Sequence, residues 1–297
     1  MNPILLAFNR SFARLVLGTC VCAGFFAASS PSGAWGRVGH QTVAYIAQDQ
    51  LTPQARKAVQ DILGPGEDLA SVSTWADTIV KSRPETAPWH FFNLDVRQSQ
   101  GKYDIADVCK NHDCVVDQIE KDYGILGQRF ASRREKREVL KFLVHFLGDI
   151  HQPLHCADDK DRGGNEKWFR YFGSSGHWRR YTWVNFHSFW DNLLEPKAKE
   201  NPRRLASRLE KRISPQDEKS WAHGKALDWA YESFLIAQND IYKGIPEGPL
   251  LEKNRWGKDL PEDYYSPRMR GIVDRQLEKA GVRLAFLLNT LFSTKNF

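Results

Sequence analysis

The chain has 297 residues, of which 41% are hydrophobic and 26% are charged, and its formal net charge at pH 7 is +6. This length is sufficient to bury a sizeable core as one large domain or two small ones. The mildly basic balance is compatible with a polyanionic substrate without being specific for one. The longest apolar run, residues 15–28, falls short of the roughly 20 residues of a transmembrane helix, so we expect no membrane span.

The first 34 residues are typical of a secretory signal peptide. A segment with two arginines precedes the apolar stretch 15–28, and small residues occupy the −3 and −1 positions of a cleavage site before Trp35. We therefore expect removal of residues 1–34, a mature domain 35–297 and a secreted or periplasmic protein. A rival interpretation is a lipoprotein cleaved before Cys20, where the preceding residue fits poorly. Loss of the leader removes two arginines and no acid, so the charge falls from +6 to +4.

Three cysteines follow the leader. Cys109 and Cys114 lie five residues apart in a polar segment, a spacing that favours a small local disulfide in an oxidising compartment. Cys156 directly follows His155, so it is either a metal ligand or, like most single thiols, a small packed residue.

Hydrophobic spacing predicts a mainly α-helical single domain with few or no strands. In the first half, Thr52 and Pro53 form an N-cap and first-turn pair. The helices expected there are Val38–Leu51, Thr52–Leu63, Leu69–Lys81, Cys114–Tyr123 and Arg133–Ile150, and the segment Trp89–Val96 is expected to be extended.

The second half begins with a segment rich in glycine and polar residues, Asp158–His177, which is expected to be a long loop or a hairpin. The helices expected after it are Asn185–Leu194, Pro202–Ile213, Glu218–Tyr242 and Met269–Phe292, with a loop at Gly244–Tyr265.

Two His–Asp pairs carry the first chemical signal. His145 and Asp149 lie four residues apart in an apolar helix, so their side chains project from one face. A buried imidazole and carboxylate need a partner, and either a divalent metal or a mutual hydrogen bond in the core provides one. His187 and Asp191 repeat the spacing, and this repetition favours the metal.

Further histidines lie near acids or near the expected mature terminus. Zinc takes three or four protein ligands, so a set of eight candidates suits two or three ions better than one. The candidates are His40, Asp77, His90, His145, Asp149, His155, His187 and Asp191.

Six motifs occur in the order found in one known family: WGRVGH, WAD, WHFFN, HFLGDIHQPLH, RGGN and NFHSFWD. Together with WAYES and QLEKAGVRLAFLLN, they span essentially the whole expected mature chain. On these residues the sequence resembles the zinc-dependent, single-strand-specific nucleases of fungi, plants and bacteria (the nuclease S-one/P-one type, bifunctional nuclease and 3′-nucleotidase). The resemblance implies a helical fold with a buried trinuclear zinc cluster.

The resemblance also implies which residues hold each zinc ion. The sites are Asp77, His90 and His145, with Asp149 bridging, for the first; His155, His187 and Asp191 for the second; and Asp149, His40, and the free α-amino group and carbonyl of Trp35 for the third. An uncleaved chain has no free amine at Trp35, so cleavage of the leader matters chemically.

The implied activity is hydrolysis of single-stranded RNA and DNA to 5′-phosphorylated products and removal of 3′-phosphate from nucleotides. Asp77 and Asp149 would hold two zinc ions that share a water. This water would lose its proton near neutral pH and act as the nucleophile. Asn165 matches the family's phosphate-contacting asparagine. The cationic residue usual three positions after the WAD aspartate is a valine here, so Lys81 or Arg83 is expected to replace it.

Two further residues are implied to bind the base. Phe91 matches an aromatic position that stacks a base, a contact worth about 1–3 kcal/mol, and core packing is its alternative interpretation. Asn93 stands where several members have a base-binding aspartate, which leaves the base preference open. His151 is expected to make a structural hydrogen bond, and the basic run ASRREKR (131–137) is interpreted as a solvated face rather than a nucleic-acid track.

Two rival functions remain at this point. A zinc-dependent phospholipase C has a similar trinuclear site that begins with an N-terminal tryptophan, but RGGN, the CxxxxC segment and the basic balance favour the nuclease. A non-catalytic secreted protein stabilised by zinc is the other rival, and such closed sites are usually rich in cysteine. We expect a monomer whose substrates are single-stranded nucleic acid and 3′-nucleotides.

Overall fold

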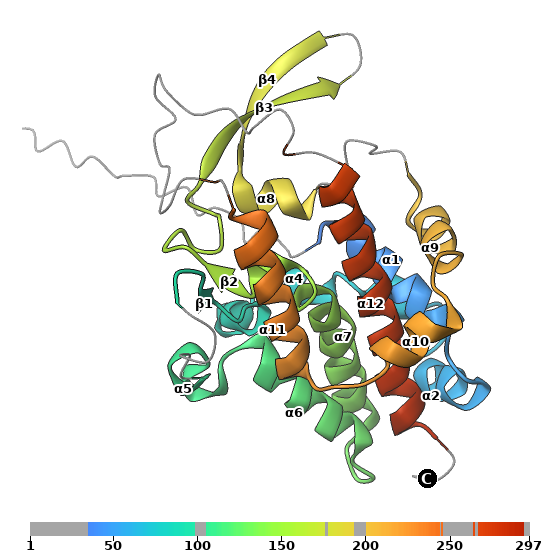
Figure 1. Ribbon diagram of the computed structural model, residues 1–297. Helices are drawn as coiled ribbons and strands as arrows, with labels where there is room; N and C mark the ends of the chain where they lie inside the picture. Colours follow the sequence, from blue (N-terminus) through green and yellow to red (C-terminus); the bar gives the residue numbers. More distant parts are fainter. Residues whose placement is uncertain are drawn as a thin grey trace, which may run out of the picture. The chain divides into compact units, whose positions relative to one another are not determined.

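The computed structural model describes residues 35–98, 105–175, 178–192, 200–243, 245, 264 and 267–293, with backbone only for 170–175 and 178–182. In these ranges the chain forms a mainly α-helical domain with two short strand pairs, as predicted (Figure 1). The expected leader and most of the expected loop Gly244–Tyr265 lie outside the described residues. No described helix is long and apolar enough to cross a membrane.

The chain begins with α1 (Arg37–Asp49) and α2 (Pro53–Leu63), close to the predicted bounds. The Thr52 hydroxyl caps α2 by accepting a hydrogen bond of 3.2 Å from the backbone N–H of Ala55. The N-cap prediction is therefore confirmed.

The predicted single helix Leu69–Lys81 is wrong, because the structure has two short helices, α3 (Leu69–Val72) and α4 (Trp75–Ile79). The Ser73 hydroxyl closes α3 by donating to the Ala70 carbonyl at 2.9 Å. The break leaves the Ser73 carbonyl free of the helical ladder, and this carbonyl has a partner in the site described below.

The helix α7 (Arg133–Asp149) lies at the centre of the domain and packs against α1, α6 (Val115–Gly127) and α12 (Pro267–Leu291) (Figure 1). A capping box begins it: Ser132 accepts from the backbone of Glu135, whose carboxylate accepts from Ser132. The last eleven residues of α7 are all buried.

The segments around α7 are short. The expected extended segment Trp89–Val96 is in part a 3₁₀ helix, because η1 runs to His90 before the chain extends. The elements are η1 (Pro84–His90), β1 (Leu94–Asp95), α5 (Ile105–Val108), η2 (Lys110–His112), η3 (Pro153–His155), β2 (Ala157–Asp158), β3 (Trp168–Ser175), β4 (Trp178–Asn185) and α8 (Phe186–Asp191). The strands β1 and β2 pair in parallel, and β3 and β4 form the antiparallel hairpin that the sequence allowed.

Among the described residues of the C-terminal third, five elements stand in place of the predicted three helices. They are α9 (Pro202–Glu210), α10 (Pro215–Trp221), α11 (Ala226–Ile236), the π-helical turn η5 (Ala237–Ile241) and α12. The predicted helix Glu218–Tyr242 is thus divided. Gly224, with φ +88°, turns the chain between α10 and α11, a conformation that favours glycine.

Candidate metal centre

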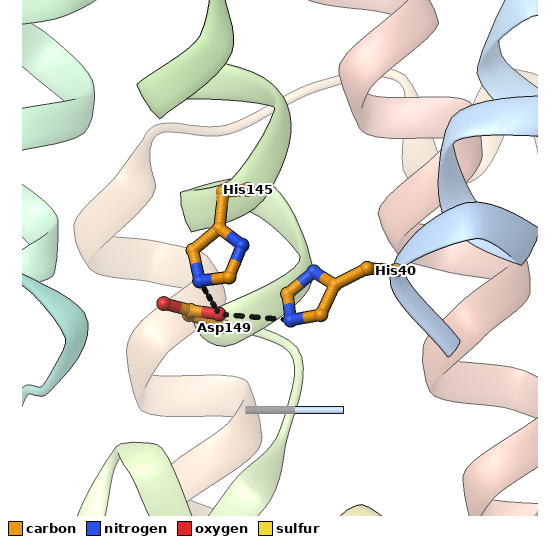
Figure 2. Close-up of side chains that lie close together, drawn as sticks. All are labelled: His40, His145 and Asp149. Carbon is orange, nitrogen blue, oxygen red and sulfur yellow. Dashed lines mark ion pairs between the residues drawn. The ribbon is translucent and has the colours of Figure 1, made fainter. Parts of the chain in front are cut away.

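The carboxylate of Asp149, at the C-terminal end of α7, is fully buried among three imidazoles. Its Oδ1 lies 3.3 Å from Nε2 of His145 and 3.4 Å from Nε2 of His40, which comes from α1 (Figure 2). Its Oδ2 lies 2.8 Å from Nδ1 of His90 at the end of η1. Asp149 therefore joins ligand candidates from three separate elements, as its predicted bridging position requires.

The first group of candidates is completed by Asp77 of α4. Its Oδ1 lies 3.4 Å from Nε2 of His145 and 3.9 Å from Nδ1 of His90. The Asp77 side chain is 27% exposed, whereas His145 and Asp149 have no exposure. The group therefore opens to solvent on the Asp77 side. His40 stacks on His145 with ring centroids 4.1 Å apart, which places a third group beside the first.

The second predicted group comes from η3 and α8. The Nε2 atoms of His155 and His187 lie 3.0 Å apart, and Oδ2 of Asp191 is 3.8 Å from Nε2 of His187. The side chain of Asn185 caps α8, so His187 and Asp191 project from one face of this short helix.

Backbone carbonyls accept a hydrogen bond from Nδ1 of three of these rings and so determine which tautomer each neutral ring adopts. Nδ1 of His145 donates to the carbonyl of Ser73 at 2.7 Å, at the break between α3 and α4. Nδ1 of His155 donates to the carbonyl of His90 at 2.8 Å, and Nδ1 of His187 donates to that of Gly163 at 2.7 Å. In a neutral ring the remaining Nε2 then carries a lone pair. Carbonyl partners of this kind commonly orient metal-ligating histidines.

This arrangement fits a divalent cation. Burial, followed by the neighbouring His155, lowers the pKa of His187 to about 3, and burial also lowers the pKa of His155. Both rings are therefore neutral at pH 7, and their lone pairs face one another at 3.0 Å unless a cation lies between them. Among the described residues, the buried atoms Nε2 of His40, Oδ1 of Asp149 and Oδ2 of Asp191 lack a hydrogen-bond partner. Imidazole and carboxylate donors of this kind suit zinc.

Two residues that the sequence analysis did not single out support the ligands. The side chain of Gln152 donates to Oδ1 of Asp191 at 2.7 Å and accepts from the N–H of Leu154 at the same distance. Gly148 allows α1 to approach α7, because a Cβ at this position would lie 2.6 Å from Nδ1 of His40. Both residues lie within HFLGDIHQPLH, so the sequence identified the motif but did not indicate the role of either residue.

The N-terminal ligand candidate and the predicted base-binding residues lie as follows. Trp35 is buried, and the N–H of the next residue donates to the carbonyl of Asp191 at 2.9 Å. The half-buried ring of Phe91 lies 4.9 Å from the ring of His155. Asn93 is exposed. The side-chain amide of Asn165 donates to the carbonyl of Arg162, in the loop whose Gly163 carbonyl holds His187.

The two candidate phosphate-binding cations differ in their surroundings. Lys81 is exposed on the segment that follows α4. Arg83 is held by Glu138 at 2.6 Å and by Glu85 at 3.2 Å. No described contact places either cation against the metal groups, and both roles stay predictions.

The three cysteines that follow the expected leader, and His151, lie outside the three His/Asp groups. Cys109 and Cys114 form the expected disulfide. Burial raises the pKa of Cys156, and its thiol donates to the carbonyl of Ile150, which agrees with the packed interpretation. His151 donates to the Leu147 carbonyl and accepts from Arg283, so it makes the expected structural hydrogen bonds.

Comparison of the whole chain with known families agrees with the order of its motifs. The model of the S1/P1 nucleases matches residues 35–293, which begin at Trp35. The chain belongs to the S1/P1 nuclease family. As a member, it is a nuclease, a hydrolase whose substrates are nucleic acids.

Relatives of this S1/P1 nuclease come from fungi and plants. Nuclease S1 of Aspergillus oryzae is 28% identical over 291 residues, which cover 92% of this chain and 97% of that protein. Nuclease P1 of Penicillium citrinum is 27% identical over 288 residues, or 88% of this chain and 99% of that protein. Endonuclease 2 of Arabidopsis thaliana is 29% identical over 293 residues, which cover 87% of this chain and 90% of that protein.

Proposed function

We propose that this S1/P1 nuclease is a secreted or periplasmic, zinc-dependent, single-strand-specific enzyme with a catalytic domain at residues 35–297. It hydrolyses RNA and DNA to 5′-phosphorylated products and removes 3′-phosphate from nucleotides. The buried Asp149 carboxylate between three imidazoles is the observation that supports this proposal most directly. Closed structural zinc sites are usually rich in cysteine, whereas this set contains only His and Asp and opens beside Asp77.

Three zinc ions are proposed, one for each of the predicted ligand sets. The groups Asp77–His90–His145, His155–His187–Asp191 and His40–His145–Asp149 each bring their ligand atoms within 4.8 Å of one another. The third set would gain the amine and carbonyl of Trp35 after cleavage of the leader. Trp35 is buried, and the N–H of Gly36 donates a hydrogen bond to the carbonyl of Asp191; both observations support this placement of Trp35.

The proposed ions supply Lewis acidity and, near neutral pH, a hydroxide nucleophile. The protein's side chains position the substrate around them. The ring of Phe91, half-buried beside His155, presents a surface on which a base stacks. Asn165 donates a hydrogen bond from its side-chain amide to a phosphoryl oxygen. The hydrogen bond from His187 to the Gly163 carbonyl holds the loop that contains Asn165 beside the His155–His187–Asp191 group. Of the two cations, Lys81 is the stronger candidate for the phosphate contact because two carboxylates already engage Arg83.

Substitution of the bridging carboxylate tests the metal-dependent function. Asp149→Asn removes the negative charge shared by two ligand sets, so we expect zinc content to fall and hydrolysis of single-stranded DNA, RNA and 3′-nucleotides to drop at least about 100-fold. Asp61→Asn, at an exposed site in α2, is the matched control. A folded Asp149→Asn variant with undiminished hydrolysis would contradict the catalytic assignment.

Composition and substrate class are tested on the purified mature protein. Metal analysis with N-terminal sequencing is expected to give about three zinc ions and a first residue of Trp35. A mixture of single-stranded DNA, RNA and phosphatidylcholine separates the nuclease from a phospholipase, because cleavage of lipid alone would overturn the proposal.

A further inference from the structure

A basic pocket of about 600 Å³ lies beside the first half of α7, away from the proposed ligand groups. Its walls include Pro65, which follows α2, and Trp75 of α4, and four basic residues from α7 complete them: Arg133, Arg134, Arg137 and Lys141. The run 131–137 was interpreted from sequence as a solvated face. The structure places three of its arginines around a hollow, and Arg133 and Arg134 are exposed there.

The charge of this pocket is positive. Its one acidic wall residue, Glu138, is bound by Arg83 at 2.6 Å, outside the α7 cluster. Glu67 pairs with both Arg137, at 2.7 Å, and Lys141, at 3.6 Å. Arg133 and Arg134 are both exposed and form no ion pair within the part of the chain that the structure describes. Two cations therefore remain available to an anionic ligand.

Three of the basic wall residues lie on the same row of α7 as two of the ligand candidates. The basic wall residues and the ligands share a spacing of four residues: Arg133, Arg137, Lys141, His145 and Asp149. Residues four apart are neighbours on a helix, so this series forms one ridge that winds slowly about the axis. At a rise of 1.5 Å per residue, Arg133 lies about 18 Å along the helix from His145.

Trp75 of the pocket wall belongs to the same short helix, α4, as the ligand candidate Asp77. Nζ of Lys141 lies 5.3 Å from the Trp75 ring, and Trp75 precedes Asp77 by two positions in α4. Asp77 is the partly exposed ligand candidate of that group. A strand that leaves the site past Asp77 would thus meet an aromatic ring and then cations, the combination that binds single-stranded nucleic acid without sequence preference.

We propose that this pocket binds the phosphate backbone of a single-stranded substrate several nucleotides away from the bond that is cut. The inference rests on the proposed function and extends it to a remote subsite. A stacked strand advances about 3.4 Å per nucleotide, so 18 Å corresponds to about five nucleotides. Arg133 and Arg134 contact the remote phosphates, and a mononucleotide bound at the metal groups does not reach them.

Reversal of charge in the pocket tests the proposal. The ligand is a phosphorothioate oligodeoxynucleotide of about 20 nucleotides, longer than the 4–16 nucleotides of common single-strand sites. Affinity is measured across salt concentrations for the metal-loaded enzyme and for Arg133→Glu/Arg134→Glu. Each phosphate contact contributes about 0.7 to the slope of log affinity against log salt, so the double variant is expected to lose about 1.4 of slope and at least tenfold in affinity at low salt. Lys136→Glu, compared with the single variant Arg134→Glu, is the control, because it makes the same reversal of one charge on α7 outside the pocket wall.

A second readout separates a remote subsite from general damage. The ratio of kcat/KM for a long oligonucleotide to that for a 3′-nucleotide is expected to fall about tenfold in the double variant and to hold in Lys136→Glu. A wild-type salt slope, equal effects in Lys136→Glu and Arg134→Glu, or an equal loss on both substrates would overturn the proposal. Absence of all hydrolysis by the wild-type enzyme would refute the proposed function instead, and the salt slope would still report on the pocket.

Discussion

At the scale of single residues, groups that are not themselves ligand candidates hold the candidates in place. The carbonyls of Ser73, His90 and Gly163 orient three imidazoles, and none of these carbonyls is identifiable from residue type. Gln152 does the same for Asp191 through its side chain. The ligand candidates could be selected from the sequence because His and Asp are unusual on apolar helices. Their supports could not, because any residue has a carbonyl.

Gln152 is the support that mutation can remove. Gln152→Met keeps the volume but loses the hydrogen bond to Asp191, so we expect zinc affinity of the His155–His187–Asp191 group to fall about 10- to 100-fold. Zinc release to a competing chelator measures this change. The control is Gln238→Met, because Gln238 donates to the Val96 carbonyl and touches no ligand candidate. Wild-type zinc retention in Gln152→Met would show that Asp191 needs no such support.

At the scale of elements, the site depends on close helix packing and on interrupted helices. The break between α3 and α4 exposes the Ser73 carbonyl to His145, and the missing Cβ of Gly148 lets His40 of α1 reach Asp149 on α7. Helical periodicity predicted α1 and α7 well, because their patterns are long and local. It joined α3 to α4 and α10 to α11, because apolar spacing does not register a break that tertiary hydrogen bonds stabilise.

The approach of α1 to α7 is testable at Gly148. In Gly148→Ala the new methyl would lie 2.6 Å from Nδ1 and 2.8 Å from Cε1 of His40, so the ring must move. We expect loss of the ion assigned to His40 and a destabilisation of about 1–3 kcal/mol from overpacking. Metal analysis and thermal unfolding measure both effects. Gly124→Ala in α6 meets open space, and there we expect a gain of up to about 1 kcal/mol from helix propensity. Full zinc content in Gly148→Ala would be inconsistent with this packing argument.

At the scale of the whole molecule, the dependence of stability on pH includes a buried acid remote from catalysis. Burial raises the pKa of Asp122 in α6 to about 8, with Lys121 opposing and Glu138 adding to the shift. An aspartate in the unfolded chain titrates near 3.9. Between about pH 4 and pH 8 the unfolded chain therefore releases a proton that the folded protein retains. Asp122 thus lowers the free energy of unfolding increasingly as the pH rises through this interval.

Asp122→Asn resembles the protonated acid in shape and does not titrate. We expect it to stabilise the protein little near pH 4 and increasingly toward pH 8, by up to about 1.4 kcal/mol for each pH unit. Denaturant unfolding of both proteins across this range measures the difference, in which metal contributions common to both cancel. Asp61→Asn, exposed and paired with Lys57 in α2, should show no such trend. A gain for Asp122→Asn that is independent of pH would contradict the raised pKa.

The sequence by itself determined the helical class, the family and the eight side-chain ligand candidates, because periodicity, residue type and motif order are local properties of the chain. The tertiary structure decided which candidates meet, and it placed the lone pairs of His155 and His187 within 3.0 Å of each other. It also brought Trp75 of α4 beside the arginines of α7, so that together they line one pocket. These features depend on contacts between segments far apart in sequence, since the approach of α1 and α4 to α7, and of α8 to η3, is set by packing that no local pattern specifies.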